Sequence, residues 1–129
     1  MGAVSLVNPH RVAPYNDEHF SMDFDQQAAR LDRRLLVLTR KEYDLLALLV
    51  EHAGEIIPRD ALLMQVWSYG AEIRTRTLDV HIRRLRKKLG AYAEEYVETI
   101  FGIGYRFQPF HAVRYFRGPA ARPAMAIGA

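Results

Sequence analysis

One stretch of the chain decides the fold that the sequence predicts: RTLDVHIRRLRKKL, residues 76–89. Thr75 or Thr77 is suited to cap the start of a helix here, and Gly90 is suited to end it. Four apolar side chains recur at helical spacing and share one narrow stripe: Leu78, Ile82, Leu85 and Leu89. The stretch therefore predicts an amphipathic helix that packs this stripe into a core.

The opposite face of the predicted helix is cationic. Residues 74–88 hold seven Lys or Arg residues and one acidic residue, Asp79, whereas the whole chain has a net charge of only +3. This concentration of positive charge favours a polyanionic partner. A merely solvated helix face is the alternative, although such a face normally interleaves both signs of charge.

An α-helix fits the major groove of B-DNA, where arginine can donate two hydrogen bonds to guanine and an apolar side chain can meet the thymine methyl. Their positions on the helix make Arg84 and Val80 candidate base readers. Arg86 lies nearer the boundary with the core and suits a base or a phosphate. His81, at the edge of the apolar stripe, suits a structural role or a phosphate contact far better than a metal site. Three flanking cations suit phosphates: Arg76, Arg83 and Lys87.

Length and composition exclude several classes of protein. The chain has 129 residues, of which 50% are hydrophobic and 26% charged, and this predicts one globular domain with short tails. The absence of cysteine excludes disulfide scaffolds and thiolate zinc sites. The longest apolar run, Leu45 to Val50, is too short to cross a bilayer, and the N-terminus has no secretory signal pattern. We therefore expect a soluble, cytoplasmic protein.

Catalytic chemistry is not indicated. The five histidines are dispersed along the chain, and no nucleophile, base and orienting group share a local spacing. We expect neither a metal nor a cofactor, and we expect that the protein is not an enzyme.

Working outward toward the N-terminus, short strands precede the helices. Phe20, Met22 and Phe24 alternate with polar residues, which is typical of a strand with one buried face. Ala29 and Leu31 belong to a second predicted strand. Residues 35–38 form a third, after a turn at residues 32–34. A small antiparallel sheet is therefore predicted first.

Two helices should follow the sheet. Thr39 and Glu42 have the spacing of a capping box and predict a helix from about Arg40 to Ala53. Pro58 is suited to the start of a second helix, whose apolar face holds Leu62, Leu63, Val66 and Trp67. A loop at residues 68–74 then leads to the cationic helix. This order of elements indicates an α+β fold.

A hairpin should close the domain. Residues 96–100 and 105–107 have strand character, with a turn at Gly102-Ile103-Gly104. The two glycines do not make a phosphate loop, because no third glycine or following helix accompanies them. A hairpin placed after a recognition helix is a wing, and we expect its tip to reach the adjacent minor groove or the DNA backbone. Residues 1–19 and 109–129 are predicted tails around a domain at residues 20–108.

The chain resembles the OmpR/PhoB winged-helix effector domain in four blocks, residues 38–46, 58–67, 76–89 and 99–107. The resemblance implies a bacterial transcription regulator of the two-component type. It implies a winged helix-turn-helix with a four-stranded N-terminal antiparallel sheet, a three-helix core and a C-terminal β-hairpin wing. The Ser68–Arg74 loop resembles the loop through which some members of the family touch RNA polymerase. Members often bind direct repeats as head-to-tail pairs, so the resemblance is compatible with such a dimer on DNA.

The resemblance also assigns roles to residues. It places four residues near bases: Thr77, Val80, Arg84 and Arg86. It places Arg76, His81 and Arg83 at phosphates. The predicted wing residues are Phe101, Gly102, Gly104 and Arg106. Phe101 stands where the family often has an arginine that enters the minor groove, and a phenyl ring cannot supply that cation.

Two further expectations follow from the resemblance. Family members usually follow a phosphorylatable receiver domain, and 19 leading residues cannot form one, so phosphorylation control within this chain is not expected. The leading hypothesis is a sequence-specific regulator that binds double-stranded DNA. The runner-up is a protein-interaction module that docks on RNA polymerase or another regulator. It is favoured by Phe101 on the predicted wing and by the aromatic residues of the predicted tail, Phe110, Tyr115 and Phe116.

Overall fold

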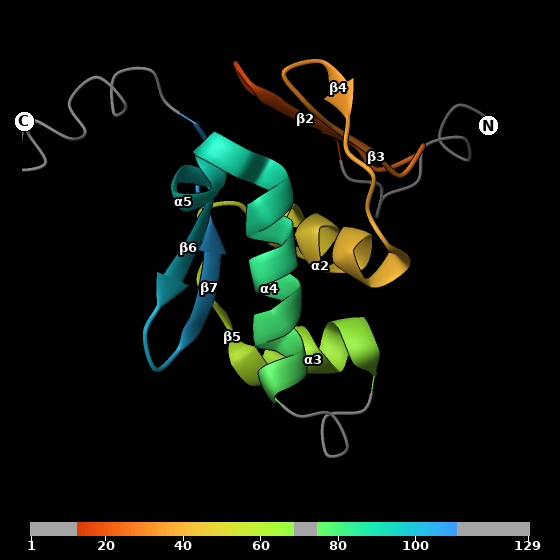
Figure 1. Cartoon of the computed structure of the whole chain (residues 1–129). Coiled ribbons are helices and arrows are strands. Elements are labelled where there is room, and N and C mark those ends of the chain that lie inside the picture. Colours follow the sequence, from red (N-terminus) through yellow and green to blue (C-terminus); the bar gives the residue numbers. More distant parts are fainter. Residues whose placement is uncertain (1–12, 69–74, 111–129) are drawn as a thin grey trace, which may run out of the picture.

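The computed structural model describes residues 13–68 and 75–110 (Figure 1). It confirms the predicted α+β winged helix: a four-stranded antiparallel sheet comes first, three helices form the centre, and a C-terminal hairpin closes the domain. The N-terminal sheet and the hairpin lie on different sides of the helical centre.

The N-terminal sheet has the order β1-β2-β3-β4. Its strands are β1 (Tyr15–Asn16), β2 (Phe20–Asp23), β3 (Ala28–Leu31) and β4 (Arg34–Leu35). The alternation in β2 predicts its faces correctly, because Phe20 and Met22 are buried and Ser21 and Asp23 are only half-buried. The residues that follow Leu35 extend toward the first helix without strand pairing.

Two sequence predictions about this sheet are wrong in detail. The third predicted strand, residues 35–38, pairs only through Leu35, and Arg34 belongs to the strand rather than the turn. The turn has two residues, Asp32 and Arg33, with φ of 49° and 72°. Positive φ at both central residues gives a turn whose twist matches the flanking strands, so the shorter turn is the favoured one.

Residues 13–19 belong to the folded domain, although the sequence analysis placed them in a tail. Tyr15 pairs with Met22 as β1, and the Asp17 carboxylate accepts hydrogen bonds from the amides of His19 and Phe20, both at 2.8 Å. The same carboxylate accepts from the hydroxyls of Tyr15, at 2.5 Å, and Tyr96, at 2.8 Å.

The C-terminal boundary is also wrong by at least two residues. The amide of Phe110 donates to Asp17 at 3.2 Å, and the ring of Phe110 lies 4.6 Å from that of His19, edge to face. Asp17 thereby joins the two ends of the domain. No sequence period marks these residues because the contacts that order them span up to 93 positions.

The helical centre contains α2 (Arg40–Glu51), α3 (Arg59–Trp67) and α4 (Thr75–Leu89). The capping box that the sequence predicts is present, with Glu42 N donating to the Thr39 hydroxyl and Thr39 N donating to the Glu42 carboxylate. Helix α2 ends two residues before the predicted Ala53, and Gly54 follows at φ 89°. Pro58 is the N-cap of α3 rather than its first residue.

Between α4 and the hairpin lie a 3₁₀ turn, Gly90–Tyr92, and the short helix α5 (Ala93–Tyr96). The sequence analysis predicted neither and assigned Tyr96 to a strand. A four-residue helix is too short to show a helical period. Tyr96 is fully buried, and its ring stacks on that of Phe107 at 5.4 Å between centroids.

The hairpin consists of β6 (Val97–Ile100) and β7 (Gly104–Phe107), and a third strand, β5 (Ile57–Pro58), pairs with β7 in the order β5-β7-β6. The sequence analysis placed Gly104 in the turn, but it is the first residue of β7. A Cβ atom at Gly104 would lie 2.0 Å from the Ile57 carbonyl oxygen, so only glycine permits this approach. The wing is therefore attached directly to the chain that enters α3.

The core joins the sheet, the helices and the wing. The four residues of the predicted stripe on α4 are all at most 1% exposed, and burial of each such side chain stabilises the fold by about 2 kcal/mol. Glu42, the one buried charged residue among those described, accepts from Lys88 Nζ at 2.5 Å. No helix in the described ranges has the length and hydropathy needed to span a membrane.

Candidate nucleic-acid interface

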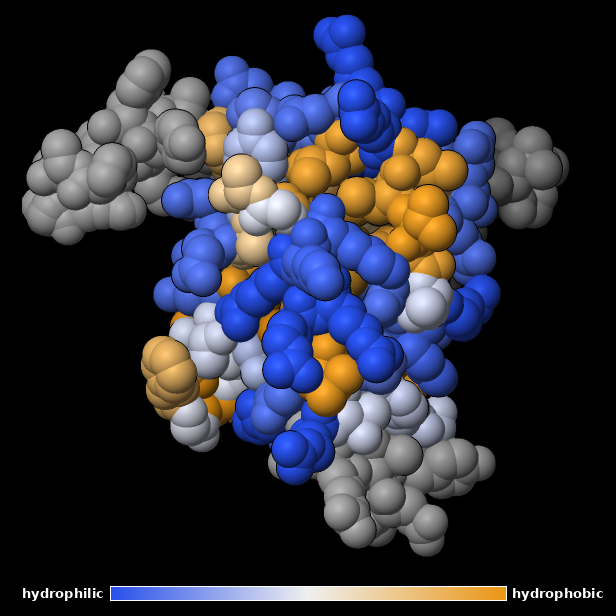
Figure 2. Space-filling view, in the orientation of Figure 1, coloured by the Kyte–Doolittle hydropathy of each residue, from blue (hydrophilic) through white to orange (hydrophobic). Residues whose placement is uncertain are grey.

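Helix α4 has two distinct faces. Its apolar stripe lies in the core, and the opposite face is exposed beside the wing (Figure 1). Figure 2 shows hydrophilic side chains gathered over this helix around a small apolar spot. The exposed face holds four cations, Arg76, Arg83, Arg84 and Lys87, and Val80 lies half-buried between them.

Among the residues that the structure describes, no acidic side chain pairs with these cations. Within residues 13–68 and 75–110, Arg76, Arg83, Arg84 and Lys87 take part in no ion pair and no side-chain hydrogen bond. A surface face whose guanidinium and ammonium groups lack carboxylate partners is suited to phosphate contacts. The structure therefore preserves the one-sided charge that the sequence indicates.

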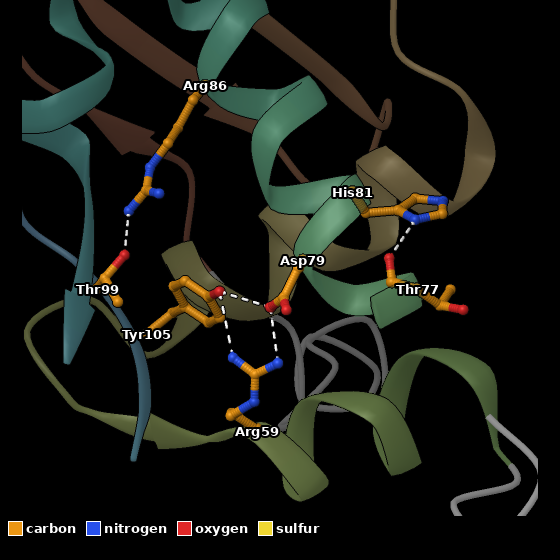
Figure 3. A network of polar contacts seen from close by, with 7 residues as sticks. All are labelled: Arg59, Thr77, Asp79, His81, Arg86, Thr99 and Tyr105. Atoms are coloured by element: carbon orange, nitrogen blue, oxygen red, sulfur yellow. Dashed lines mark hydrogen bonds and ion pairs between the residues drawn. The ribbon is translucent and has the colours of Figure 1, made fainter. Parts of the chain in front are cut away.

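The one acidic residue of the helix, Asp79, is paired. Its Oδ1 accepts from Arg59 Nη2 at 2.7 Å and from the Tyr105 hydroxyl at 2.9 Å (Figure 3). Arg59 begins α3 and Tyr105 belongs to β7, so this cluster joins both helices to the wing. Burial and the hydrogen bond to Asp79 raise the pKa of the Tyr105 hydroxyl, which keeps it a donor.

Arg86 does not face outward with the other cations. Its Nη2 donates to the Val97 carbonyl at 2.8 Å and to Thr99 Oγ1 at 2.6 Å, and its guanidinium lies 5.8 Å from the centre of the Tyr105 ring. Figure 3 shows this side chain reaching from α4 to the wing. The geometry argues against the predicted base-reading role, because Nε and Nη2, which carry three of the five N–H donors of Arg86, bond to the wing.

His81 is held on the helix. Its Nδ1 lies 2.8 Å from the Thr77 carbonyl oxygen, and because that oxygen can only accept, Nδ1 carries the proton (Figure 3). The ring also contacts Trp67 edge to face, with 4.9 Å between centroids. In the neutral ring Nε2 is then an acceptor, so a phosphate contact requires protonated His81.

A hollow of about 540 Å³ lies between the helix and the wing. Arg76, Val80 and Arg83 line it from α4, and Tyr105 lines it from β7. Two of the four free cations of the helix therefore border a concave surface. Asp79 and Arg86 also line the hollow from α4, and because Asp79 is paired with Arg59, the helix side of the hollow has an excess of positive charge.

The charged residues of the wing lie on its strands, and its exposed apolar residues lie at the tip. Arg106 is paired with Glu98, with 2.9 Å between Nη2 and Oε1, so its charge is used along the strands. Phe101 is 90% exposed and Ile103 is 51% exposed at the tip. Gly102 has φ 79°, a conformation that the turn requires and that side chains rarely adopt. Of the predicted wing residues, Phe101 alone projects its side chain freely.

The loop predicted to touch RNA polymerase cannot be placed on this interface. Ser68 ends α3 with a left-handed φ of 73°, and residues 69–74 lie outside the described part of the chain. No group of three His, Asp or Glu side chains is arranged to hold a metal ion among residues 13–68 and 75–110.

Sequence reasoning missed the residues that support the interface. Arg59 and Tyr105 are 46 positions apart and Arg59 and Asp79 are 20 apart, so no local spacing connects them. Thr99, which accepts from Arg86, was assigned only strand character. Asp79 is a signal in the sequence, since a single acidic residue on a cationic helix indicates a partner elsewhere in the fold.

Comparisons with known proteins bear on the same region. The family model described as "Transcriptional regulatory protein, C terminal" matches residues 33–107. The uncharacterized transcriptional regulatory protein YclJ of Bacillus subtilis is 47% identical over 70 residues, 54% of this chain and 31% of that protein. The transcriptional regulatory protein SrrA of Staphylococcus aureus is 34% identical over 108 residues, 81% of this chain and 45% of that protein.

Solved structures of isolated DNA-binding domains share this fold over almost their whole length, and two of them serve as examples. The DNA-binding domain of Klebsiella pneumoniae RstA, in complex with the RstA box, has a TM-score of 0.67 and 31% identity, covering 75% of this chain and 98% of that one. The DNA-binding domain of CpxR from E. coli has a TM-score of 0.66 and 27% identity, covering 75% and 97%. This chain thus spans less than half of the two curated relatives and matches isolated DNA-binding domains along almost their whole length.

Proposed function

Because the chain belongs to the OmpR/PhoB-type family of transcriptional regulatory protein C-terminal domains, we propose that it is a transcription regulator that binds double-stranded DNA by sequence. The observation that carries the proposal is the exposed face of α4, with four cations that have no acidic partner among the described residues. An α-helix of this kind fits the major groove, and the wing beside it has access to the backbone or the minor groove. The matching family model describes transcriptional regulatory proteins, and the proposal therefore assigns no enzymatic activity to this domain.

The residues divide into three groups in this proposal. Arg84 and Val80, with Thr77 at the start of the helix, contact bases. Arg76, Arg83 and Lys87 contact phosphates, joined by His81 when its ring is protonated. Arg86, by contrast, supports the wing from within the protein, as its bonds to Val97 and Thr99 indicate.

Contacts with other proteins are a second part of the proposal. They comprise a polymerase contact through residues 68–74 and head-to-tail pairing on direct repeats, and both are supported by the family resemblance. The protein-interaction alternative is not favoured by the comparisons, whose solved relatives include a domain bound to its DNA box.

Selection of bound oligonucleotides from a random pool, followed by titration of the selected duplex at several salt concentrations, tests the proposal. We expect the logarithm of affinity to fall linearly with the logarithm of salt, with a slope of about −0.9 for each phosphate neutralised. A scrambled duplex should bind more weakly with a similar slope. Failure to enrich any sequence, or affinity that does not depend on salt, would contradict DNA binding through this face.

A further inference from the structure

The tip of the wing presents an aromatic side chain on a rigid turn. Ile103 N donates to the Ile100 carbonyl at 2.9 Å, which closes a four-residue turn with Phe101 and Gly102 at its centre. The φ of 79° at Gly102 and the absence of positive φ at Phe101 are those of a type II turn. Phe101 is 90% exposed and Ile103 is 51% exposed on this turn.

The turn is fixed to the body of the domain. The amide of Arg59, the first residue of α3, donates to the Ile103 carbonyl at 3.0 Å. On the other side of the hairpin, Arg86 of α4 bonds to Thr99. Hydrogen bonds thus tie the hairpin to α3 and α4, and the phenyl ring of Phe101 remains exposed on it.

The wing brings no free cation to its tip. Glu98 and Arg106 are the charged residues of the hairpin, residues 97–107, and they pair with each other. The attraction of the narrow minor groove for an inserted cation is therefore not available to this tip. An apolar side chain acts on DNA differently, since it enters between base steps, partly unstacks them and kinks the duplex.

The position of the tip indicates which partner it meets. In Figure 1 the turn between β6 and β7 extends toward the same side of the molecule as the Thr75 end of α4. That helix carries the four cations without acidic partners. A polyanion held by this face lies beside the wing tip, whereas an acidic protein surface would offer the phenyl ring no comparable stack of flat rings.

We propose that Phe101 is an apolar wedge that inserts between base pairs in the minor groove next to the site contacted by α4. The inference rests on the proposed DNA-binding function and adds a residue that determines specificity. The wing then selects flexible pyrimidine–purine steps, TA or CA/TG, because these unstack at the lowest cost. It does so without reading a base edge.

Fluorescence of 2-aminopurine tests the wedge directly. The base replaces single adenines along both flanks of the selected duplex, and its emission rises when it is unstacked. We expect binding of the wild-type chain to raise the emission at one flanking step. Phe101→Ala should abolish that rise and weaken binding roughly 5-fold to 150-fold, the range of base–aromatic stacking. Replacing the step with a stiff A-tract should weaken wild-type binding and leave Phe101→Ala unaffected.

Val37→Ala is the matched control, because Val37 is an apolar residue, 81% exposed, that precedes α2 far along the chain from the wing. It should change neither the emission nor the affinity. Phe101→Ala should unfold at the wild-type temperature, since the ring is exposed.

Binding of the selected duplex with no emission change at any step would overturn the wedge and leave DNA binding intact. Loss of pairing between two bound copies in Phe101→Ala, with single-copy affinity unchanged, would instead make the tip a protein contact. Absence of duplex binding by the wild type would overturn both proposals.

Discussion

Arg59 Nη2 lies 2.7 Å from Asp79 Oδ1 and thereby ties the start of α3 to the exposed side of α4. Tyr105 donates to the same oxygen, so one carboxylate connects both helices to the wing. Asp79 carries the only negative charge of α4 and its side chain is 51% exposed, but the ion pair with Arg59 offsets that charge. A helix that would otherwise carry a repulsive group toward a polyanion therefore presents an excess of positive charge.

Asp79→Asn should lower the free energy of unfolding by about 1 kcal/mol, because a half-exposed ion pair and the hydrogen bond from the Tyr105 hydroxyl to the carboxylate are weakened together. Urea denaturation measures this change. Asp60→Asn, which removes an exposed acid from the same region, is the control and should change stability by a few tenths of a kcal/mol, the size of a helix-dipole contribution. Equal effects in the two variants would show that the cluster has no special role.

Arg84→Ala should cost about 1–3 kcal/mol on the selected duplex and relax the preference for one base pair, as expected for a base contact. Competition binding against single-position variants of the duplex measures both effects. Lys87→Ala should weaken binding to all sequences alike and reduce the magnitude of the salt slope by about one. A uniform loss in Arg84→Ala would reassign Arg84 to a phosphate.

Arg86→Ala should behave differently from Arg84→Ala. It leaves the Val97 carbonyl and Thr99 hydroxyl without their donor, so the free energy of unfolding should fall by about 1–3 kcal/mol. The base preference of the variant, measured on the same panel of duplexes, should match that of the wild type. A changed preference with unchanged stability would restore the base-reading role that the sequence analysis predicted.

Asp17 should make stability depend on pH in the acid range. Burial acts to raise the pKa of its carboxyl group, but hydrogen bonds from Tyr15, from the amides of Phe20 and His19 and from Tyr96 outweigh it and hold the pKa below its usual value. The unfolded chain binds this proton more readily than the folded chain. The stabilisation is therefore complete above the unfolded pKa and is lost as the pH falls through the lower folded pKa.

Asp17→Asn tests this coupling. It should lower the free energy of unfolding at neutral pH by about 2 kcal/mol, because the amide accepts fewer of the donors. The difference between variant and wild type should shrink as the pH falls below about 4. Thermal unfolding followed at a series of pH values measures it, with the exposed Asp25→Asn as control. A constant difference at all pH values would rule out the carboxylate charge as the cause.

The sequence predicts those elements whose signals are local. The capping box of Thr39 and Glu42 and the stripe from Leu78 to Leu89 each depend on residues a few positions apart, and the structure contains both. The strand β5 has two residues, one of them Pro58, and cannot show a period. It exists because Gly104 lets β7 approach Ile57, a contact that only the folded chain brings together.

In the candidate site, too, the sequence predicts what depends on nearby residues and misses what depends on distant ones. The helical period separates the outward cations from the core, and this assigns Arg76, Arg83 and Lys87 to the exposed face. Arg86 lies at the boundary of the two faces, where the period gives no answer. Its direction is set by acceptors on the wing, 11 and 13 positions away. Arg59 has no local signal, since Asp79 and Tyr105 are 20 and 46 positions away. Asp17 bonds to near neighbours, but its bonds to Tyr96 and Phe110 span 79 and 93 positions.

The pairing of β5 with β7 helps to fix the distance between the helices and the wing. Strand β5 runs straight into α3, and the Ile103 carbonyl accepts from the first amide of that helix. These contacts fix α3 to the hairpin, and the hydrogen bonds of Tyr105 with Asp79 and of Arg86 with Thr99 fix α4 to the same hairpin. The cationic helix and the wing tip are therefore held at one distance from each other. If both contact DNA as proposed, we expect one base pair inserted between their two contact segments to weaken binding, because it moves the second segment along the axis and rotates it.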